Sequence, residues 1–204
     1  TQGVSSAASD VYKRQILVSC SNSIDNNNSK ENSEDKIVEK PLPKKIFDKN
    51  KDGQYITENE IRKSIKLYLD KNEELSEASE YYEDKIDSEE SLSQNEIKKL
   101  KKLNNLNQKN DKNFKSYIKS NKLPKSYRKD TERISKYISH SNKYSQNLEK
   151  KIDKIIDKGI NQKKVSIKDI GEIEDDSTIV NGREQSKIEK FLNEKNIKTK
   201  AFKK

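Results

Sequence analysis

Apolar residues recur at helical spacing through most of the chain that follows residue 57. Thr57 and Glu60 form a capping box at the start of the first such stretch. Beyond it, apolar positions recur at i, i+4, i+7 and i+8, at Ile61, Ile65, Tyr68 and Leu69. This spacing predicts an amphipathic helix to about residue 71. A second helical stretch carries Leu75, Ala78, Tyr82 and Ile86 on one face.

A second capping box, Ser93 with Glu96, opens a longer helical pattern. Its apolar positions are Ile97, Leu100, Leu103, Leu106, Phe114, Tyr117 and Ile118. Leu123-Pro124 should end this helix, because proline cannot continue a helix and turns the preceding residue away from helical geometry.

The next pattern begins near Asp130 and has a heptad-like 4-3-4-3 spacing up to Gly159, a natural residue for a helix end. Its repeating positions are Ile134, Ile138, Ser141, Ser145, Leu148, Ile152 and Ile155. A short helix over residues 165–173, a turn at Asn181-Gly182 and a last amphipathic helix follow, the last marked by Ile188, Phe191 and Leu192. No segment has the alternation of a strand, so we predict an all-α fold, an elongated bundle of amphipathic helices.

The only cysteine, Cys20, completes a bacterial lipobox, Leu17-Val18-Ser19-Cys20. A lipobox predicts a diacylglyceryl thioether on the thiol and cleavage just before Cys20, and two acyl chains are enough for stable membrane anchoring. Before it only Ile16, Leu17 and Val18 form an apolar run, so we interpret residues 1–19 as a non-native leader joined to a truncated signal peptide. The alternative is a cytosolic protein with a chance LVSC.

The chain after Cys20 divides into two parts. Residues 20–44 are rich in Asn and Ser and have no hydrophobic period, which predicts a disordered, lipid-anchored tether that ends near Pro41 and Pro43. Residues 45–204 form the predicted helical domain. Charged residues make up 39% of the chain and hydrophobic residues 28%, so the core of this domain should be thin.

Candidate chemistry for catalysis is scarce. His140 is the only histidine, lies among Ser139, Ser141 and Asn142 on a polar helix and has no nucleophile to activate, and no glycine-rich phosphate loop is found. A single cysteine also excludes an intramolecular disulfide and a Cys/His zinc cluster. These observations favour a non-enzymatic protein without a cofactor other than the lipid.

Charge is distributed unevenly along the chain. Residues 73–90 carry nine acids and one lysine, a net −8, and residues 97–129 carry twelve Lys or Arg and one Asp, a net +11. Helices of opposite charge joined by a short link favour an antiparallel hairpin. The overall charge of +9 could attract anionic lipid or a wall polymer, although solvated lysines with no ligand remain the default explanation. Nucleic acid fits the charge alone, but an exported protein would seldom meet it.

One segment opens like an EF-hand calcium loop. Oxygen-bearing side chains occupy positions 1, 3 and 5, and glycine occupies position 6: Asp48, Asn50, Asp52 and Gly53. The pattern then fails, because position 8 is Tyr55 and position 12, which needs a bidentate glutamate, is Asn59, with Glu60 one place too late. A one-residue bulge could restore the register. A calcium-responsive structural protein that uses Asp48–Glu60 is therefore the alternative function, against an ordinary turn before the Thr57 cap.

Several segments together carry a family resemblance. They are the lipobox at Cys20, KKIF at 44–47, NDKNF at 110–114, KSYIKSNKLPKSYRK after it and KIEKFLNEKNIKTKAF near the end. From Cys20 onward the chain resembles the NDxxF motif lipoproteins of low-GC Gram-positive bacteria. The resemblance implies a small surface lipoprotein, lipid-anchored on the extracytoplasmic face of the cell membrane, whose biochemical role is not established.

The NDKNF segment allows two roles. On a helix, Asn110 and Asp111 share a face with Phe114, so an amide, a carboxylate and a ring lie together. In one role Phe114 is a core residue and the polar pair caps or bridges to a neighbouring helix. In the other, the three residues form a recognition patch for a protein partner. We expect a binding or interaction module in either case.

Overall fold

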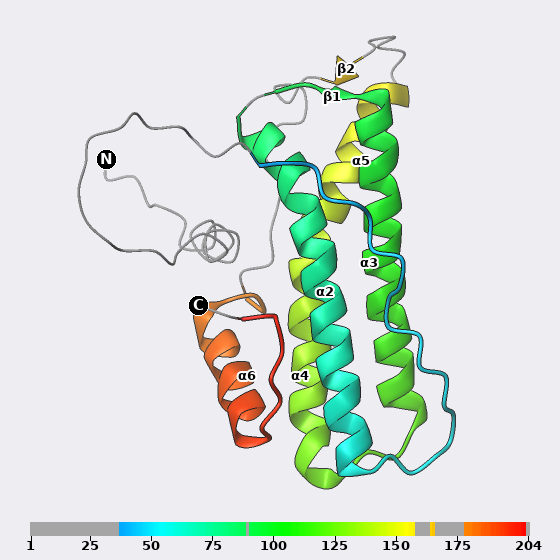
Figure 1. The fold of residues 1–204 in the computed structure, drawn as a ribbon, viewed down its shortest axis with the longest axis vertical. Coiled ribbons are helices and arrows are strands. Elements are labelled where there is room, and N and C mark those ends of the chain that lie inside the picture. The colour runs from blue at the N-terminus through cyan, green and yellow to red at the C-terminus, as the bar shows by residue number, and fades with distance from the viewer. Residues whose placement is uncertain (1–36, 89, 158–163, 166–177, 203–204) are drawn as a thin grey trace, which may run out of the picture.

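The computed structural model describes residues 37–88, 90–157, 164–165 and 178–202 (Figure 1). These residues form five helices, α2 (Glu58–Asp87), α3 (Gln94–Ser120), α4 (Lys125–Ser141), α5 (Lys143–Asp157) and α6 (Gly182–Glu194). Two short strands, β1 (Leu92–Ser93) and β2 (Lys164–Val165), pair antiparallel over two residues each. The all-α prediction is confirmed, and the helices form an elongated bundle. Cys20, the expected tether up to residue 36 and Gly159 lie outside the described residues.

Helix α2 joins two stretches that the sequence divides near residue 71. Its capping box forms as predicted, because Thr57 Oγ1 accepts from Glu60 N at 3.2 Å and Glu60 Oε2 accepts from Thr57 N at 2.9 Å. The two apolar stretches become one helix because no glycine or proline interrupts residues 58–87. α2 and α3 then pack against each other as the predicted antiparallel hairpin (Figure 1), with Lys85 Nζ 2.8 Å from Glu96 Oε1 near the turn.

The predicted single helix from Asp130 to Gly159 is wrong in two respects. α4 begins at Lys125, directly after Pro124, because the first turn of a helix lacks partners for its N–H groups and tolerates a preceding proline. The helical run is then interrupted at Asn142, between α4 and α5. The interruption falls between Ser141 and Ser145, core-register positions where a hydroxyl replaces the apolar side chain that would hold a continuous helix in place.

Two smaller predictions also change. Val165 was expected at the start of a short helix, and instead pairs with Leu92 in the β1–β2 ladder, while residues 166–173 lie outside the described chain. Asn181 is the N-cap of α6 and not the centre of a turn, because its Oδ1 accepts from Glu184 N at 3.0 Å.

The buried apolar residues divide into two groups along the bundle. One group, here called the aromatic core, lies between α2, α3, α4 and α6. Its members are Phe47, Ile56, Ile61, Ile65, Tyr68, Leu69, Phe114, Tyr117, Ile118, Leu123, Tyr127, Ile134, Tyr137, Ile138, Val180, Ile188, Phe191, Leu192, Ile197 and Ala201. The other, the aliphatic core, lies between α2, α3, α5 and β1, with Leu75, Ala78, Tyr82, Ile86, Leu92, Ile97, Leu100, Leu103, Leu148, Ile152 and Ile155.

Polar side chains lie between these two cores on α2, on α3 and at the junction of α4 and α5. On α2 the buried residue between them is Asn72, and between α4 and α5 it is the half-buried Asn142. On α3 the separating residues, all buried, are Asn104, Asn107, Asn110 and Asp111. We call these six residues the asparagine layer.

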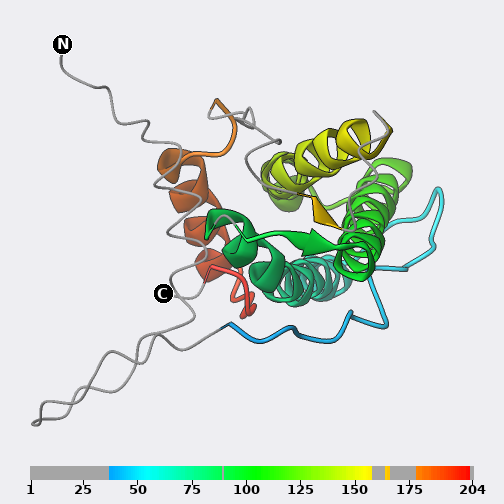
Figure 2. The same ribbon diagram turned by 90° about the horizontal axis from the view of Figure 1, so that it is seen from above.

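Residues 37–47 form a strap that runs along the α2–α3 hairpin (Figures 1 and 2). Glu39 accepts from Lys99 Nζ at 2.8 Å and from Tyr82 OH at 2.6 Å, and Leu42 and Ile46 pack against the aliphatic core. The strap ends at Phe47, inside the aromatic core. Residues 37–44, which the sequence analysis assigned to the tether, are therefore part of the folded domain.

Candidate functional site

The NDKNF segment lies in the middle of α3 and faces inward. Phe114 and Asn110 are each 0% exposed, and Asp111 is 8% exposed. All three residues are thus enclosed by the strap, α2 and the α4–α5 junction. Their shared helical face is the buried face of α3, as the spacing of the segment requires.

Phe114 is the centre of a group of rings. Its ring stacks on Tyr68 of α2 with centroids 4.0 Å apart and an interplanar angle of 7°. The ring of Phe47 meets it edge-on at 5.2 Å. Stacked and edge-on pairs each add about 0.5–1.5 kcal/mol beyond the apolar area they bury. This packing joins α2, α3 and the strap at one point.

Two asparagines of the same segment hold the backbone of Phe47. Asn110 Oδ1 accepts from Phe47 N at 2.9 Å, and Asn113 Nδ2 donates to Phe47 O at 2.8 Å. A strap residue outside any helix or sheet needs such partners, because a buried backbone group without a hydrogen bond is costly. The two side chains therefore supply the hydrogen bonds that a neighbouring strand would make to this part of the strap in a sheet.

Asp111 connects α3 to two further elements. Its Oδ1 accepts from Tyr68 OH at 2.7 Å and its Oδ2 accepts from Asn142 Nδ2 at 3.0 Å. Asn142 also donates to Asn72 Oδ1 at 3.2 Å. Burial raises the pKa of the Asp111 carboxyl, and the hydrogen bonds from Asn142 and Tyr68 oppose this rise. Burial and the nearby Asp111 carboxylate raise the pKa of Tyr68 well above its ordinary value.

This geometry agrees with the first role considered for NDKNF, a core residue with bridging polar neighbours. A recognition patch needs side chains that a partner can touch, and Asn110, Asp111 and Phe114 are enclosed. No sequence pattern pointed to Asn142, which donates a hydrogen bond to Asp111 from the break between α4 and α5. Phe47 did have a signal, since it ends the KKIF segment of the family resemblance.

The EF-hand-like loop is held by other contacts. Asp48, Asn50 and Asp52 are exposed, and Gly53 has a positive φ of 65° that lets the chain turn toward the end of α3. There Gly53 N donates to Ser120 O at 2.8 Å. Glu60 is engaged by Lys51 Nζ and by the Thr57 cap, and these hydrogen bonds lower the pKa of its carboxyl to about 2. The described residues contain no group of three or more His, Cys, Asp or Glu placed to hold a metal ion.

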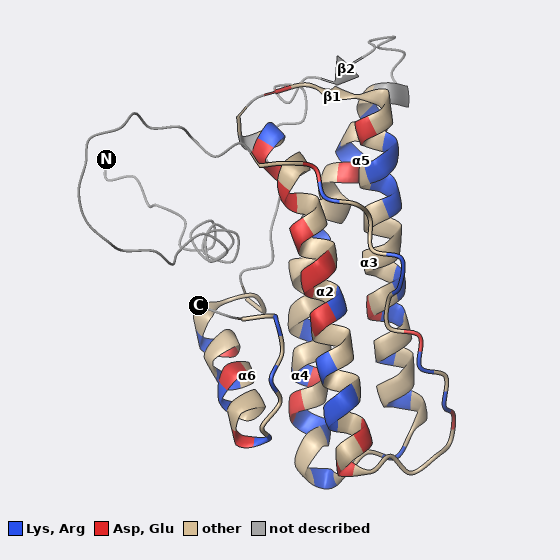
Figure 3. Ribbon diagram, viewed as in Figure 1, with Lys and Arg blue, Asp and Glu red and all other residues tan. Residues whose placement is uncertain are grey.

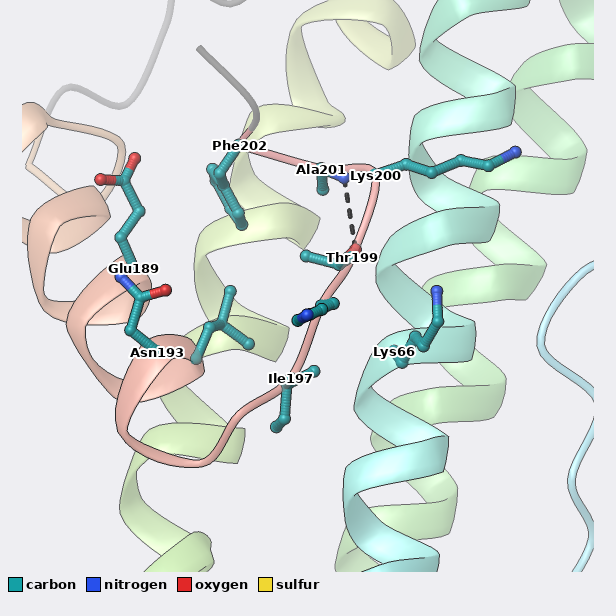
Figure 4. A pocket seen from close by; sticks show the side chains of 10 residues that line it. Lys66, Glu189, Asn193, Ile197, Thr199, Lys200, Ala201 and Phe202 are labelled. Atoms are coloured by element: carbon teal, nitrogen blue, oxygen red, sulfur yellow. Dashed lines mark hydrogen bonds between the residues drawn. The ribbon is translucent and has the colours of Figure 1, made fainter.

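A pocket of about 450 Å³ lies between α2, α6 and the C-terminal segment (Figure 4). Its walls combine apolar residues such as Leu192 and Ile197 with Lys66, Lys198 and Lys200. Lys66 is paired with Asp70, and Lys200 Nζ is 3.5 Å from Glu74 Oε1. Two of its lysines are thus neutralised within the chain, which leaves little positive charge for an anionic ligand.

His140 is half-buried near the end of α4, and its Nδ1 lies 2.8 Å from the carbonyl oxygen of Lys136.

Comparison of the chain with models of known families, with curated proteins and with solved structures gives no match. In the part of the chain that the structure describes, no helix is long and apolar enough to cross a membrane.

Proposed function

We propose that this chain is a lipid-anchored surface lipoprotein, similar to the NDxxF motif lipoproteins, that acts as a non-enzymatic binding or interaction module. Cys20 would carry the lipid on the extracytoplasmic face of the cell membrane. The observation that carries this proposal is the tetrapeptide Leu17-Val18-Ser19-Cys20, followed at once by a polar, Asn/Ser-rich segment. Two acyl chains on one cysteine supply stable anchoring without a membrane-spanning helix.

The arrangement of the body supports a binding role over a catalytic one. The contacts of the NDKNF segment lie within the protein. Asn110 bonds to the strap, and Asp111 and Phe114 contact Tyr68 of α2. The carboxylates of Glu60 and Glu96 likewise serve in capping boxes. A module built this way would meet its partner through its outer helix faces.

Metabolic labelling tests the anchor. With a complete signal peptide restored, the protein should take up an azido fatty acid in a Gram-positive host and partition into the detergent phase. Cys20→Ala removes the only thiol and should abolish both. Ser19→Ala keeps a small residue before the cysteine, so this matched control should be labelled like the parent. Equal labelling of the parent and Cys20→Ala would refute the proposal.

A further inference from the structure

The solvent face of α3 presents a row of exposed positions, five of which are lysines. The row follows the same 4-3 spacing as a coiled-coil seam but on the outer side of the helix, with Lys98, Lys102, Asn105, Lys109, Lys112, Ser116 and Lys119, all exposed. At 1.5 Å per residue, Lys98 and Lys119 lie about 32 Å apart along the axis. The acids of α3 are Glu96 and Asp111, neither of which is exposed. We call this set of positions the lysine row.

Two other lysines of α3 are paired with acids, unlike the lysines of the row. Lys99 and Lys101, on the flanks of α3, form ion pairs with Glu39 of the strap and Asp153 of α5. Among the described residues, the lysines of the row have no acidic partner within ion-pair distance. Figure 3 shows blue positions along α3, beside an α2 that carries both red and blue positions. The fold thus neutralises Lys99 and Lys101 and leaves the row charged, together with the exposed Lys115 beside it.

From this geometry we infer that the lysine row binds a linear polyanion with a phosphate in each repeat, laid along α3. This inference rests on the proposed function, because it names the partner class of the binding module. A lysine ammonium is a compact point charge with three donors, which suits phosphate oxygens without demanding one fixed orientation. A polyanion of this kind surrounds itself with condensed counterions, and binding gains free energy by releasing them.

The shape and chemistry of the row favour such a polymer over a bilayer. The large hydrophobic residues that are exposed in the described chain are Val38 and Tyr55, neither on α3, so the row offers no apolar group for insertion into lipid. The row is also narrow, with the Glu39 and Asp153 carboxylates on its two sides. A flat anionic surface would also cover these neutralised ion pairs, whereas a thin chain can follow the charged row itself.

Nucleic acid fits less well for a separate reason. Proteins that hold single strands stack the bases on aromatic side chains, in addition to contacting phosphates. The lysine row has no aromatic residue, and Tyr55 lies beyond the end of α3, with its ring 4.7 Å from Lys122 Nζ. Phosphates without bases are the better match.

The test uses the unlipidated full chain with Cys20→Ser and long-chain inorganic polyphosphate as the probe. The row variant is Lys102→Gln/Lys109→Gln/Lys112→Gln. A matched variant removes three exposed lysines elsewhere, Lys136→Gln/Lys190→Gln/Lys198→Gln, and so has the same net charge. Circular dichroism checks that all three proteins fold alike.

Affinity of the parent should fall on the order of 100-fold between about 50 and 200 mM salt if the five lysines neutralise five phosphates. The row variant should weaken binding at least about tenfold at low salt and lower the slope of log affinity against log salt by about 2. The matched variant should stay within about threefold of the parent.

Three outcomes would overturn the inference. Equal loss in both variants would assign any binding to net charge alone, and no binding of polyphosphate by the parent would remove the partner. Row-dependent binding to phosphatidylglycerol vesicles without polyphosphate binding would assign the row to a membrane surface. Tighter binding of single-stranded DNA with the same number of phosphates would assign it to nucleic acid. None of these outcomes depends on lipidation at Cys20, so this inference and the anchor proposal fail separately.

Discussion

The aromatic core and the aliphatic core are built from the same two long helices but differ in what holds them. The aromatic core draws residues from positions 47 to 201 and includes the rings of Phe47, Tyr68 and Phe114. The aliphatic core draws on positions 75 to 155 and contains one buried ring, that of Tyr82. The first therefore joins distant parts of the chain, and the second joins α5 to the hairpin.

This difference shows how a chain with 28% hydrophobic residues builds a stable bundle. Each aromatic side chain buries about 150–250 Å², so a few rings placed together replace many aliphatic residues. The asparagine layer marks the boundary, where Asn104 bonds to α5 and Asn142 bonds to Asn72 and Asp111. We expect the two cores to differ in resistance to opening, with the aliphatic core opening first.

Truncation of the central ring should have the largest effect. Phe114→Ala should lower the free energy of unfolding by about 3–5 kcal/mol, because it removes a fully buried ring and leaves a cavity beside Tyr68 and Phe47. Chemical denaturation followed by circular dichroism measures this loss. Leu148→Ala in the aliphatic core is the comparison, and should speed amide exchange in α5 while α4 and α6 stay protected. Equal acceleration in all three helices would mean that the two cores unfold as one unit.

Removal of either asparagine that bonds to the backbone of Phe47 should lower stability by less than truncation of Phe114. Asn110→Ala should cost about 1–3 kcal/mol, because the Phe47 N–H is then buried without an acceptor. Asn113→Ala should cost about 0.5–1.5 kcal/mol, because Asn113 is half-buried and water can reach the freed carbonyl. Thermal melts of the two single variants compare them directly. An Asn113→Ala loss equal to that of Asn110→Ala would contradict the assigned order.

Stability should also depend on pH through Glu73, on α2 beside the asparagine layer. Burial, with Glu77, Glu80 and Asp70 nearby, raises the pKa of Glu73 to about 7 from the ordinary 4.5. The folded protein then binds this proton more tightly than the unfolded chain, so Glu73 lowers stability as pH rises through this interval. Glu73→Gln should raise the thermal midpoint at about pH 8 by about 2–4 °C and leave it unchanged near pH 4. Glu132→Gln, at an exposed site on α4, is the matched control for the loss of one carboxyl group.

Calcium should have the smallest effect. Because Asn59 occupies the position of the bidentate glutamate and Glu60 is engaged by Lys51 and Thr57, we expect a dissociation constant no lower than about 10⁻⁴ M. Calorimetry on the full chain measures it. Micromolar affinity that Asp48→Ala abolishes would show that the loop at the end of the aromatic core is a calcium site after all.

Local signals explain why most helices could be predicted. The capping boxes at Thr57 and Ser93 mark real helix starts, and the charge contrast between residues 73–90 and 97–129 correctly pairs α2 with α3. The break at Asn142 could not be found in the same way. Ser141 and Ser145 weaken the apolar pattern there, but the break falls at Asn142, which bonds to Asp111 and Asn72 on two other helices. The β1–β2 ladder was missed because two residues are too few to show alternation.

The site shows the same limit. Its spacing placed Asn110, Asp111 and Phe114 on one face of a helix, and the structure has them there. Whether that face points to solvent or to the core depends on what covers it, and the cover is a strap 63 residues earlier in the chain. A contact of that separation leaves no periodic trace in either segment.

The position of the strap also decides how the molecule bears a pulling force. Tension applied to the chain before residue 37 would reach the strap first and detach its contacts in sequence, as a zipper opens. The first to yield would be the Lys40 ion pairs, which are largely exposed and hold weakly, followed by the part-buried Glu39–Lys99 pair. The last would be Phe47, inserted between Phe114 and Tyr117 and bonded at both its N–H and its carbonyl. Under such a force the strap would detach from the hairpin before the helices separate from one another.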